Sequence, residues 1–338
     1  MMAVDRDTRI AEKVSRELGP AVLDLMVDER TEDVMRNPDG SLWAYRVGEG
    51  FVLVGEMSEE QAYSAVGTIA SSRETVINHE HPILETELPL NGARFEALVP
   101  PVVRSPAFAI RMRPRRIFTL DDYETAGIIT QKDDPRNLTA RPKNEFVKSV
   151  QGLCHKKVIE RAVRNRMNIL SVGATGAGKT TFANAVLDAV ARVSPNDRVV
   201  IVEDTIELQC RVRNCVELRA GGNVSLNDCV RACLRLRPTR IVIGEVRGPE
   251  ALELLKSWST GHPGGVATIH AKSAGAGVAQ FENLVAEATR APKQTAIADT
   301  IQLVIFIDLD ANIPAGRKVR EVAVVTGYQD GRYVLEQV

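Results

Sequence analysis

A glycine-rich segment in the middle of this 338-residue chain carries its most specific chemical pattern. An apolar run over residues 168–172 predicts a short strand, and residues 182–191 have the composition of a helix. Between them lies the pattern Gly-x4-Gly-Lys-Thr, in which backbone N–H groups and a helix N-terminus surround phosphate oxygens. The strand before it and the helix after it favour a nucleotide site over a turn that is glycine-rich by chance. The residues predicted to bind the phosphates are Gly173, Ala174, Thr175, Gly176, Ala177, Gly178, Lys179, Thr180 and Thr181.

Two side chains of this phosphate loop have distinct predicted roles. The ammonium group of Lys179 is expected to reach the β- and γ-phosphates, and the hydroxyl group of Thr180 is expected to ligate Mg²⁺. A phosphate site alone does not specify a reaction. The chemistry therefore depends on the groups that other strands bring to the loop.

Acidic residues follow two further apolar runs. Glu203, Asp204 and Glu207 come after the run at residues 198–202, and Glu245 ends the segment Arg-Ile-Val-Ile-Gly-Glu. Ligands of open α/β sheets bind at the carboxyl ends of the strands, so we expect these carboxylates to lie beside the phosphate loop. A carboxylate there can orient the attacking water or hold Mg²⁺ through water. Glu245 has the Walker B position and is predicted to serve the metal, whereas Glu203 and Glu207 both remain candidates for the group that acts on water.

Two histidines lie next to the apolar run at residues 266–269. His270 ends that run, and at a strand end beside the phosphate loop its ring can sense the γ-phosphate through hydrogen bonds. For His262 a structural and a functional role are equally supported. Neither histidine has the neighbours of a zinc site, and the five cysteines form no CxxC pair. We therefore predict that the protein holds no zinc and that its thiols are reduced.

Composition limits the class of protein. The net charge is −1, 44% of the residues are hydrophobic and 26% are charged, which is ordinary for a globular protein of this length. This charge gives no general reason to expect nucleic acid or an anionic membrane as a partner. No apolar run is long enough to cross a bilayer, and residues 1–12 lack an apolar signal core. A cytoplasmic location is expected, with peripheral attachment to a membrane left open.

The elements that must position these residues fall into two predicted domains. Residues 1–130 are expected to form a small α+β domain, in which residues 6–35 and 58–72 are helical and short strands complete the fold. Residues 131–142 are polar, contain two prolines and show no hydrophobic period, which indicates a linker. Residues 143–338 alternate helices with short apolar strands. This alternation predicts an α/β domain with a mostly parallel sheet that helices cover on both faces.

In this order, the motifs resemble those of the secretion-ATPase superfamily, which drives type IV secretion, type II secretion and type IV pili. The similarity covers about residues 95–310. It includes the phosphate loop, the acidic box Glu-Asp-Thr-Ile-Glu at residues 203–207, Gly-Glu-Val-Arg-Gly-Pro-Glu-Ala at residues 244–251 and Ala-Thr-Ile-His at residues 267–270. The boxes at residues 203–207 and 244–251 look like the type IV secretion branch. The segment Arg-Phe-Glu-Ala-Leu-Val-Pro-Pro-Val-Val at residues 94–103 looks closest to conjugal transfer ATPases of the TrbB type.

The resemblance implies a RecA-like ATPase domain and a homohexameric ring that works with secretion or conjugation machinery on the cytoplasmic face of the inner membrane. It implies that ATP binds with Mg²⁺ between the two domains, that Glu207 polarises the attacking water and that Glu245 serves the metal. Arginines of the N-terminal domain reach the phosphates in this family, and Arg111 and Arg113 occupy the matching stretch. Which of the two does so, and whether within one chain or between neighbours, stays open, as does the cargo.

Two other functions fit part of the sequence. A RecA-like nucleic-acid translocase or helicase would use the basic clusters at residues 111–116 and 156–166 to track phosphates. Aromatic residues make up only 4% of the chain, and none interleaves those clusters as a stacking platform requires. Direct nucleic-acid binding therefore has no strong support. The other alternative is a motor of type II secretion or of a type IV pilus, and the absence of the tetracysteine zinc module of many type II secretion ATPases argues against it.

Overall fold

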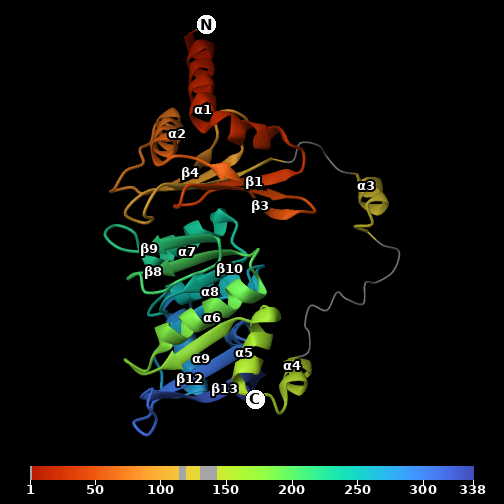
Figure 1. The fold of residues 1–338 in the computed structure, drawn as a ribbon, viewed down its shortest axis with the longest axis vertical. Coiled ribbons are helices and arrows are strands. Elements are labelled where there is room, and N and C mark those ends of the chain that lie inside the picture. The colour runs from red at the N-terminus through yellow and green to blue at the C-terminus, as the bar shows by residue number, and fades with distance from the viewer. Residues whose placement is uncertain (1, 114–118, 130–142) are drawn as a thin grey trace.

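The computed structural model describes residues 2–113, 119–129 and 143–338. Two β-sheets lie one above the other in Figure 1, the first built from the N-terminal part of the chain and the second from the C-terminal part. The predicted linker at residues 131–142 lies outside the described residues. Helix α3 (Leu120–Thr125) stands apart from both sheets in Figure 1. None of the helices within the described ranges is both long and apolar enough to span a bilayer.

The N-terminal sheet is antiparallel throughout, with the strand order β3-β2-β1-β6-β5-β4. Apolar side chains of helices α1 (Met2–Val27) and α2 (Glu59–Ser72) share one core with one face of this sheet. The strands are β1 (Thr31–Arg36), β2 (Ser41–Arg46), β3 (Gly50–Glu56), β4 (Ile83–Glu87), β5 (Arg94–Leu98) and β6 (Ala107–Arg111). The small α+β domain predicted from the sequence is thus present.

One predicted element of this domain is wrong. The expected helix over residues 6–35 ends at Val27, and residues 31–36 form β1 instead. The reason is visible in the neighbouring residues Val34 and Met35, which are both fully buried but belong to cores on opposite faces of the sheet. Only a strand directs consecutive side chains to opposite faces. The turn before β1 is held by Asp28, whose side chain accepts a hydrogen bond from the backbone N–H of Arg30 at 3.1 Å.

The C-terminal sheet has the order β14-β13-β12-β7-β11-β10-β8-β9, and the six strands from β12 to β9 in that order are parallel. Helices α4 to α6 pack on one face and α7 to α10 on the other, so the predicted architecture is confirmed. The strands are β7 (Ile169–Gly173), β8 (Arg198–Glu203), β9 (Asn214–Arg219), β10 (Arg240–Ile243), β11 (Val266–Ile269), β12 (Leu303–Leu309), β13 (Arg317–Gln329) and β14 (Arg332–Gln337). The helices are α4 (Lys143–Val150), α5 (His155–Arg164), α6 (Lys179–Val193), α7 (Leu226–Cys233), α8 (Glu250–Ser259), α9 (Ala274–Ala288) and α10 (Gln294–Thr300).

The two sheets are joined by a buried contact that is partly polar. The side chain of Asn37, just after β1, accepts a hydrogen bond from the buried guanidinium of Arg198 at 2.6 Å and donates one to Asn214 at 3.0 Å. Arg198 and Asn214 are the first residues of β8 and β9. The N-terminal sheet therefore contacts the amino ends of these strands, opposite to the end at which β7 leads into the phosphate loop.

Candidate functional site

The phosphate loop connects the carboxyl end of β7 to the first turn of α6. Gly176 and Gly178 adopt left-handed backbone angles, with φ of 79° and 94°, a region that other L-residues seldom occupy. A Cβ atom on Gly173 would lie 2.5 Å from the carbonyl oxygen of Ile307, so only glycine fits there. This tight turn at the N-terminus of a 15-residue helix fits a phosphate group, because unpaired N–H groups and the helix dipole both favour an anion.

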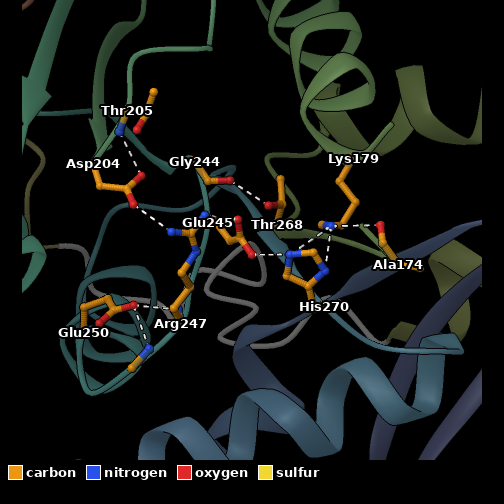
Figure 2. A network of polar contacts seen from close by, with 11 residues as sticks. Ala174, Lys179, Asp204, Thr205, Gly244, Glu245, Arg247, Glu250, Thr268 and His270 are labelled. Atoms are coloured by element: carbon orange, nitrogen blue, oxygen red, sulfur yellow. Dashed lines mark hydrogen bonds and ion pairs between the residues drawn. The ribbon is translucent and has the colours of Figure 1, made fainter. Parts of the chain in front are cut away.

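Lys179 is the first residue of α6, and its side chain is buried. The ammonium group donates a hydrogen bond to the carbonyl oxygen of Ala174 at 3.2 Å and lies 3.1 Å from Nδ1 of His270 (Figure 2). Burial lowers the pKa of Lys179, because the charged form loses solvation, while the nearby carboxylate of Glu245 acts in the opposite direction. The ammonium group of Lys179 thus lies between Ala174 of the phosphate loop and His270 at the end of β11.

Glu245 and His270 meet at the ends of neighbouring strands. His270 follows β11, which lies between β7 and β10, and its Nε2 atom lies 2.6 Å from Oε1 of Glu245. Thr268 fixes the spacing of these two strand ends, because its hydroxyl donates to the carbonyl oxygen of Gly244 at 2.7 Å. Three of the predicted site residues therefore lie in a line of contacts, in which Lys179 contacts His270 and His270 contacts Glu245 (Figure 2).

The two candidate bases of the acidic box differ in environment. Glu203 is 3% exposed, and its Oε1 atom accepts hydrogen bonds from the N–H groups of Glu207 and Leu208, both at 3.1 Å. Burial raises the pKa of Glu203, although these two hydrogen bonds partly offset it. Glu207 is exposed at the surface of the same loop. The structure thus brings both carboxylates to the site, with Glu203 holding the backbone that carries Glu207.

The oxygen groups present fit a magnesium ion. Thr180 is half-buried in the first turn of α6, and Glu245 is the carboxylate nearest to Lys179 in the contact chain. Mg²⁺ prefers hard oxygen ligands and is usually held by one or two protein groups together with phosphate and water. The described residues contain no cluster of three or more His, Cys, Asp or Glu that could hold a metal alone. Thr180 and Glu245 are accordingly the side chains suited to a metal shared with phosphate.

The N-terminal arginines do not join this group within one chain. Arg113 forms an ion pair with Glu87 at 2.8 Å. Arg111 is opposite Asp33 in the register of β6 and β1, and Asp33 forms an ion pair at 2.9 Å with Arg237, three residues before β10. That position is at the amino ends of the parallel strands. His262 is also there, because its Nδ1 lies 2.9 Å from the carbonyl oxygen of Pro238.

Two arginines near the phosphate loop were not predicted to belong to the site. Arg247 contacts two of the site carboxylates, Glu245 and Asp204. Arg317, the first residue of β13, lies against the loop so closely that a Cβ atom on Gly178 would come within 2.8 Å of its Cδ atom. Arg247 lies within one of the sequence boxes and could have been suspected from it. Arg317 is 139 residues from Gly178, and only the pairing of β12 with both β7 and β13 brings the two together.

Comparison with known proteins gives a consistent result. The profile of the type II/IV secretion system protein family matches residues 148–319. The probable conjugal transfer protein TrbB of Sinorhizobium fredii is 39% identical over 328 residues, which cover 97% of this chain and 93% of that protein. The conjugal transfer protein TrbB of Rhizobium radiobacter is 38% identical, over 97% of this chain and 94% of that protein. The crystal structure of the VirB11 ATPase from the Brucella suis type IV secretion system, at 23% identity, shares the fold with a TM-score of 0.85 over 95% of this chain and 96% of that one.

Proposed function

Because the chain belongs to the type II/IV secretion system protein family, we propose that it is the ATP-hydrolysing motor of a type IV secretion or conjugative DNA-transfer system. The observation that carries this proposal is the contact chain from Lys179 through His270 to Glu245. In this chain of contacts we assign Lys179 to the phosphates, His270 to sensing the γ-phosphate and Glu245 to the metal ion. The relatives described as conjugal transfer proteins TrbB support the choice of a transfer system over a pilus motor.

The proposed binding step uses the phosphate loop as it is built. The N–H groups of residues 173–181 surround the phosphates of ATP. The ammonium group of Lys179 leaves its contact with His270 and binds the β- and γ-phosphate oxygens instead. Thr180 and Glu245 are the residues that would hold Mg²⁺, and a bound Mg²⁺ would neutralise the charge that develops on the phosphoryl oxygens. His270 is released toward the γ-phosphate and can donate a hydrogen bond to it.

For the hydrolytic step we propose Glu207 as the group that takes a proton from the attacking water. It is exposed, and it is carried by a backbone that Glu203 fixes through two hydrogen bonds. Glu203 is the competing candidate, because burial moves its pKa toward the range of a general base. The two assignments differ in which carboxylate must keep its negative charge.

The proposed working unit is a homohexameric ring, peripheral to the cytoplasmic face of the inner membrane. Arg111 lies on the side of the N-terminal sheet that faces the amino ends of the parallel strands, and Arg113, two residues further on, is paired with Glu87. We therefore assign them to the phosphates of a neighbouring copy, where a guanidinium can stabilise the transferring phosphoryl group. Hydrolysis would then be coupled to closure and reopening of an N-terminal domain over the site of its neighbour.

A nucleic-acid translocase remains a second candidate because of one surface feature. Helix α5 exposes Lys156, Lys157, Arg161 and Arg164, and within the described part of the chain none of them forms an ion pair with a carboxylate. Such a stripe can track phosphates. Single-stranded DNA binding with a steep dependence on salt, lost when Lys157 and Arg161 are both changed to Ala, would favour this candidate over the secretion motor.

The proposal is tested by transfer in cells that depend on this chain. A strain with the gene deleted is complemented with wild type, with Lys179→Ala or with Lys148→Ala, which changes an exposed lysine of α4. We expect wild type and Lys148→Ala to restore transfer of DNA to recipients and Lys179→Ala to abolish it at equal protein level. Full transfer with Lys179→Ala would reject a role for ATP hydrolysis at this site.

A further inference from the structure

Arg247 lies at the centre of the polar network at the nucleotide site and is not a phosphate ligand in the proposed mechanism. It follows β10 by four residues, and its side chain extends between the loop after β8 and the loop after β10 (Figure 2). One guanidinium nitrogen, Nη2, donates to Oε2 of Glu245 at 2.6 Å. The other, Nη1, donates to Oδ2 of Asp204 at 2.7 Å.

The backbone beneath this side chain is held in place. The buried carboxylate of Glu250 accepts hydrogen bonds from the N–H groups of Arg247 and Gly248, at 2.7 and 2.9 Å. The preceding residue, Val246, is 2% exposed and donates its N–H to the carbonyl oxygen of Thr268 at 2.9 Å. The Cα atom of Arg247 is therefore fixed relative to β11, and the guanidinium has a defined reach.

These contacts extend the line of interactions that begins at the phosphate loop. Oε1 of Glu245 contacts His270, and His270 contacts Lys179. Oε2 of the same carboxylate is held by Arg247, which is held in turn by Asp204. Any movement of Glu245 that follows phosphate binding at Lys179 must therefore break one of the two contacts of Arg247 or move the loop at residues 204–208 with it.

We propose that Arg247 is a positioning residue that couples the phosphate loop to the loop at residues 204–208. This inference rests on the proposed function, because that loop carries Glu207. With nucleotide bound, Arg247 fixes Asp204 and so aligns the backbone of Glu207 with the metal-serving carboxylate of Glu245. Without this bridge the two strand ends respond to nucleotide independently.

Stability does not account for the arrangement. The side chain of Arg247 is 57% exposed, and ion pairs at exposed positions contribute little to stability. A planar guanidinium can donate to two carboxylates in different directions, whereas the ammonium group of lysine is a single point of charge. The bridge therefore requires arginine, while neutralisation of the acidic loop requires only a positive charge.

Steady-state ATP hydrolysis separates these two roles. We expect Arg247→Ala to lower kcat by about 10–100-fold, with the KM for ATP changed by less than about threefold. Arg247→Lys should remain close to Arg247→Ala, and combining Asp204→Ala with Arg247→Ala should add no further loss. Arg192→Ala, which removes an exposed ion pair with Asp188 on α6, serves as the matched control. Wild-type turnover of Arg247→Lys, or additive losses in the double variant, would overturn the inference.

Hydrogen–deuterium exchange gives a readout that does not depend on turnover. In wild type a non-hydrolysable ATP analogue should slow exchange at residues 174–181 and at residues 204–208. In Arg247→Ala it should slow exchange at residues 174–181 only. Equal protection of both segments in the variant would overturn the coupling role alone. Absence of protection at residues 174–181 in wild type would instead overturn the proposed function, and with it this role.

Discussion

At the scale of single residues, the acidic box separates into a buried carboxylate and an exposed one. Glu203 accepts two backbone N–H groups, and a Cβ atom on Gly244 would lie 2.8 Å from its Cγ atom, so it is enclosed on that side as well. Glu207 lies outside this enclosure and within electrostatic reach of Arg247. Because Glu203 is buried and hydrogen-bonded, it is suited to holding the loop in place. Because Glu207 is exposed, it is suited to contacting a water molecule.

Glutamine substitutions distinguish the two carboxylates. Glu207→Gln should bind ATP with Mg²⁺ normally and hydrolyse it about 10²–10⁴-fold more slowly, because an amide cannot take a proton from water. Glu203→Gln should lose less than about tenfold, because its amide oxygen can still accept the two backbone hydrogen bonds. Rates and nucleotide affinity are measured for both variants. A larger loss in Glu203→Gln than in Glu207→Gln would transfer the role of base to Glu203.

Glu96 provides a test of the structure away from the site. This carboxyl group on β5 is 3% exposed, and its Oε2 atom has no hydrogen-bond partner among the described residues. Burial raises the pKa of Glu96 to about 8, while Arg235 lowers it and Glu85 raises it further. The folded-state pKa is thus above that of the unfolded chain. The stability associated with the protonated group is fully present below the unfolded pKa near 4.5 and is lost as the pH rises to about 8.

Glu96→Gln should remove this pH dependence, because the amide is never ionised. The variant should be more stable than wild type at pH 8 by on the order of 3 kcal/mol and nearly equal to it at pH 4.5. Urea unfolding at both pH values measures the difference. The same gain in stability at both pH values would show that Glu96 is not protonated in the folded protein.

At the scale of elements, the phosphate loop depends on its contact with the start of β13. Gly178 has a left-handed backbone, and the space where a Cβ atom would lie is taken by the side chain of Arg317. Two separate features thus require glycine at the same position. The turn that is proposed to bind phosphate is built by β7, α6 and β13 together.

Gly178→Ala should therefore weaken ATP binding by at least about tenfold, through backbone strain on the order of 1–3 kcal/mol and displacement of Arg317. Gly67→Ala on α2 is the matched control, because that glycine has an ordinary φ and no atom lies within 4 Å of its added Cβ atom. The control should leave binding unchanged. Equal ATP affinity for Gly178→Ala and wild type, measured by fluorescence titration, would remove the steric argument.

The sequence predicts these elements well where the pattern is local. The phosphate loop, the acidic box and β10 are recognisable because each is a continuous segment with a strand period, and the strand order then brings Lys179, Glu245 and His270 together. The sequence predicts a helix as far as residue 35 because an apolar stripe of helical period precedes residues 31–36. Local sequence does not reveal that Val34 and Met35 pack into different cores, which requires a strand. The position of Arg317 depends on the β12–β13 pairing, and Arg111 depends on domain packing, so neither could be predicted from local sequence.

At the scale of the whole molecule, the N-terminal sheet and the C-terminal sheet of one chain share a buried contact. One apolar core includes Met35, Trp43 and Leu98 of the first together with residues of β8 to β10. Arg198 is fully buried in the same contact and bonds to Asn37. This attachment holds Arg111 at the amino ends of the parallel strands. If Arg111 serves the phosphates, as proposed, the phosphates it reaches are therefore those of another copy.

A mixing experiment tests this arrangement. Lys179→Ala alone and the double variant Arg111→Ala, Arg113→Ala alone should each hydrolyse ATP slowly, since comparable arginines contribute about 10³–10⁵-fold. In the proposed ring, mixed oligomers would contain sites in which an intact Lys179 faces an intact pair of arginines from the neighbour. The mixture should therefore be clearly more active than the sum of its parts. A mixture no more active than the separate variants, with mixed oligomers shown by mass spectrometry, would assign the arginines to their own chain or to no role.

The central claim is that this chain hydrolyses ATP at the site formed by Lys179, Glu245 and His270. The most direct measurement is the steady-state release of phosphate from ATP by purified wild type and Lys179→Ala, with Mg²⁺ and with excess EDTA. The account predicts turnover by wild type with Mg²⁺, and none above background in EDTA or in Lys179→Ala under either condition. Undiminished turnover by Lys179→Ala, or no turnover by oligomeric wild type, would contradict it.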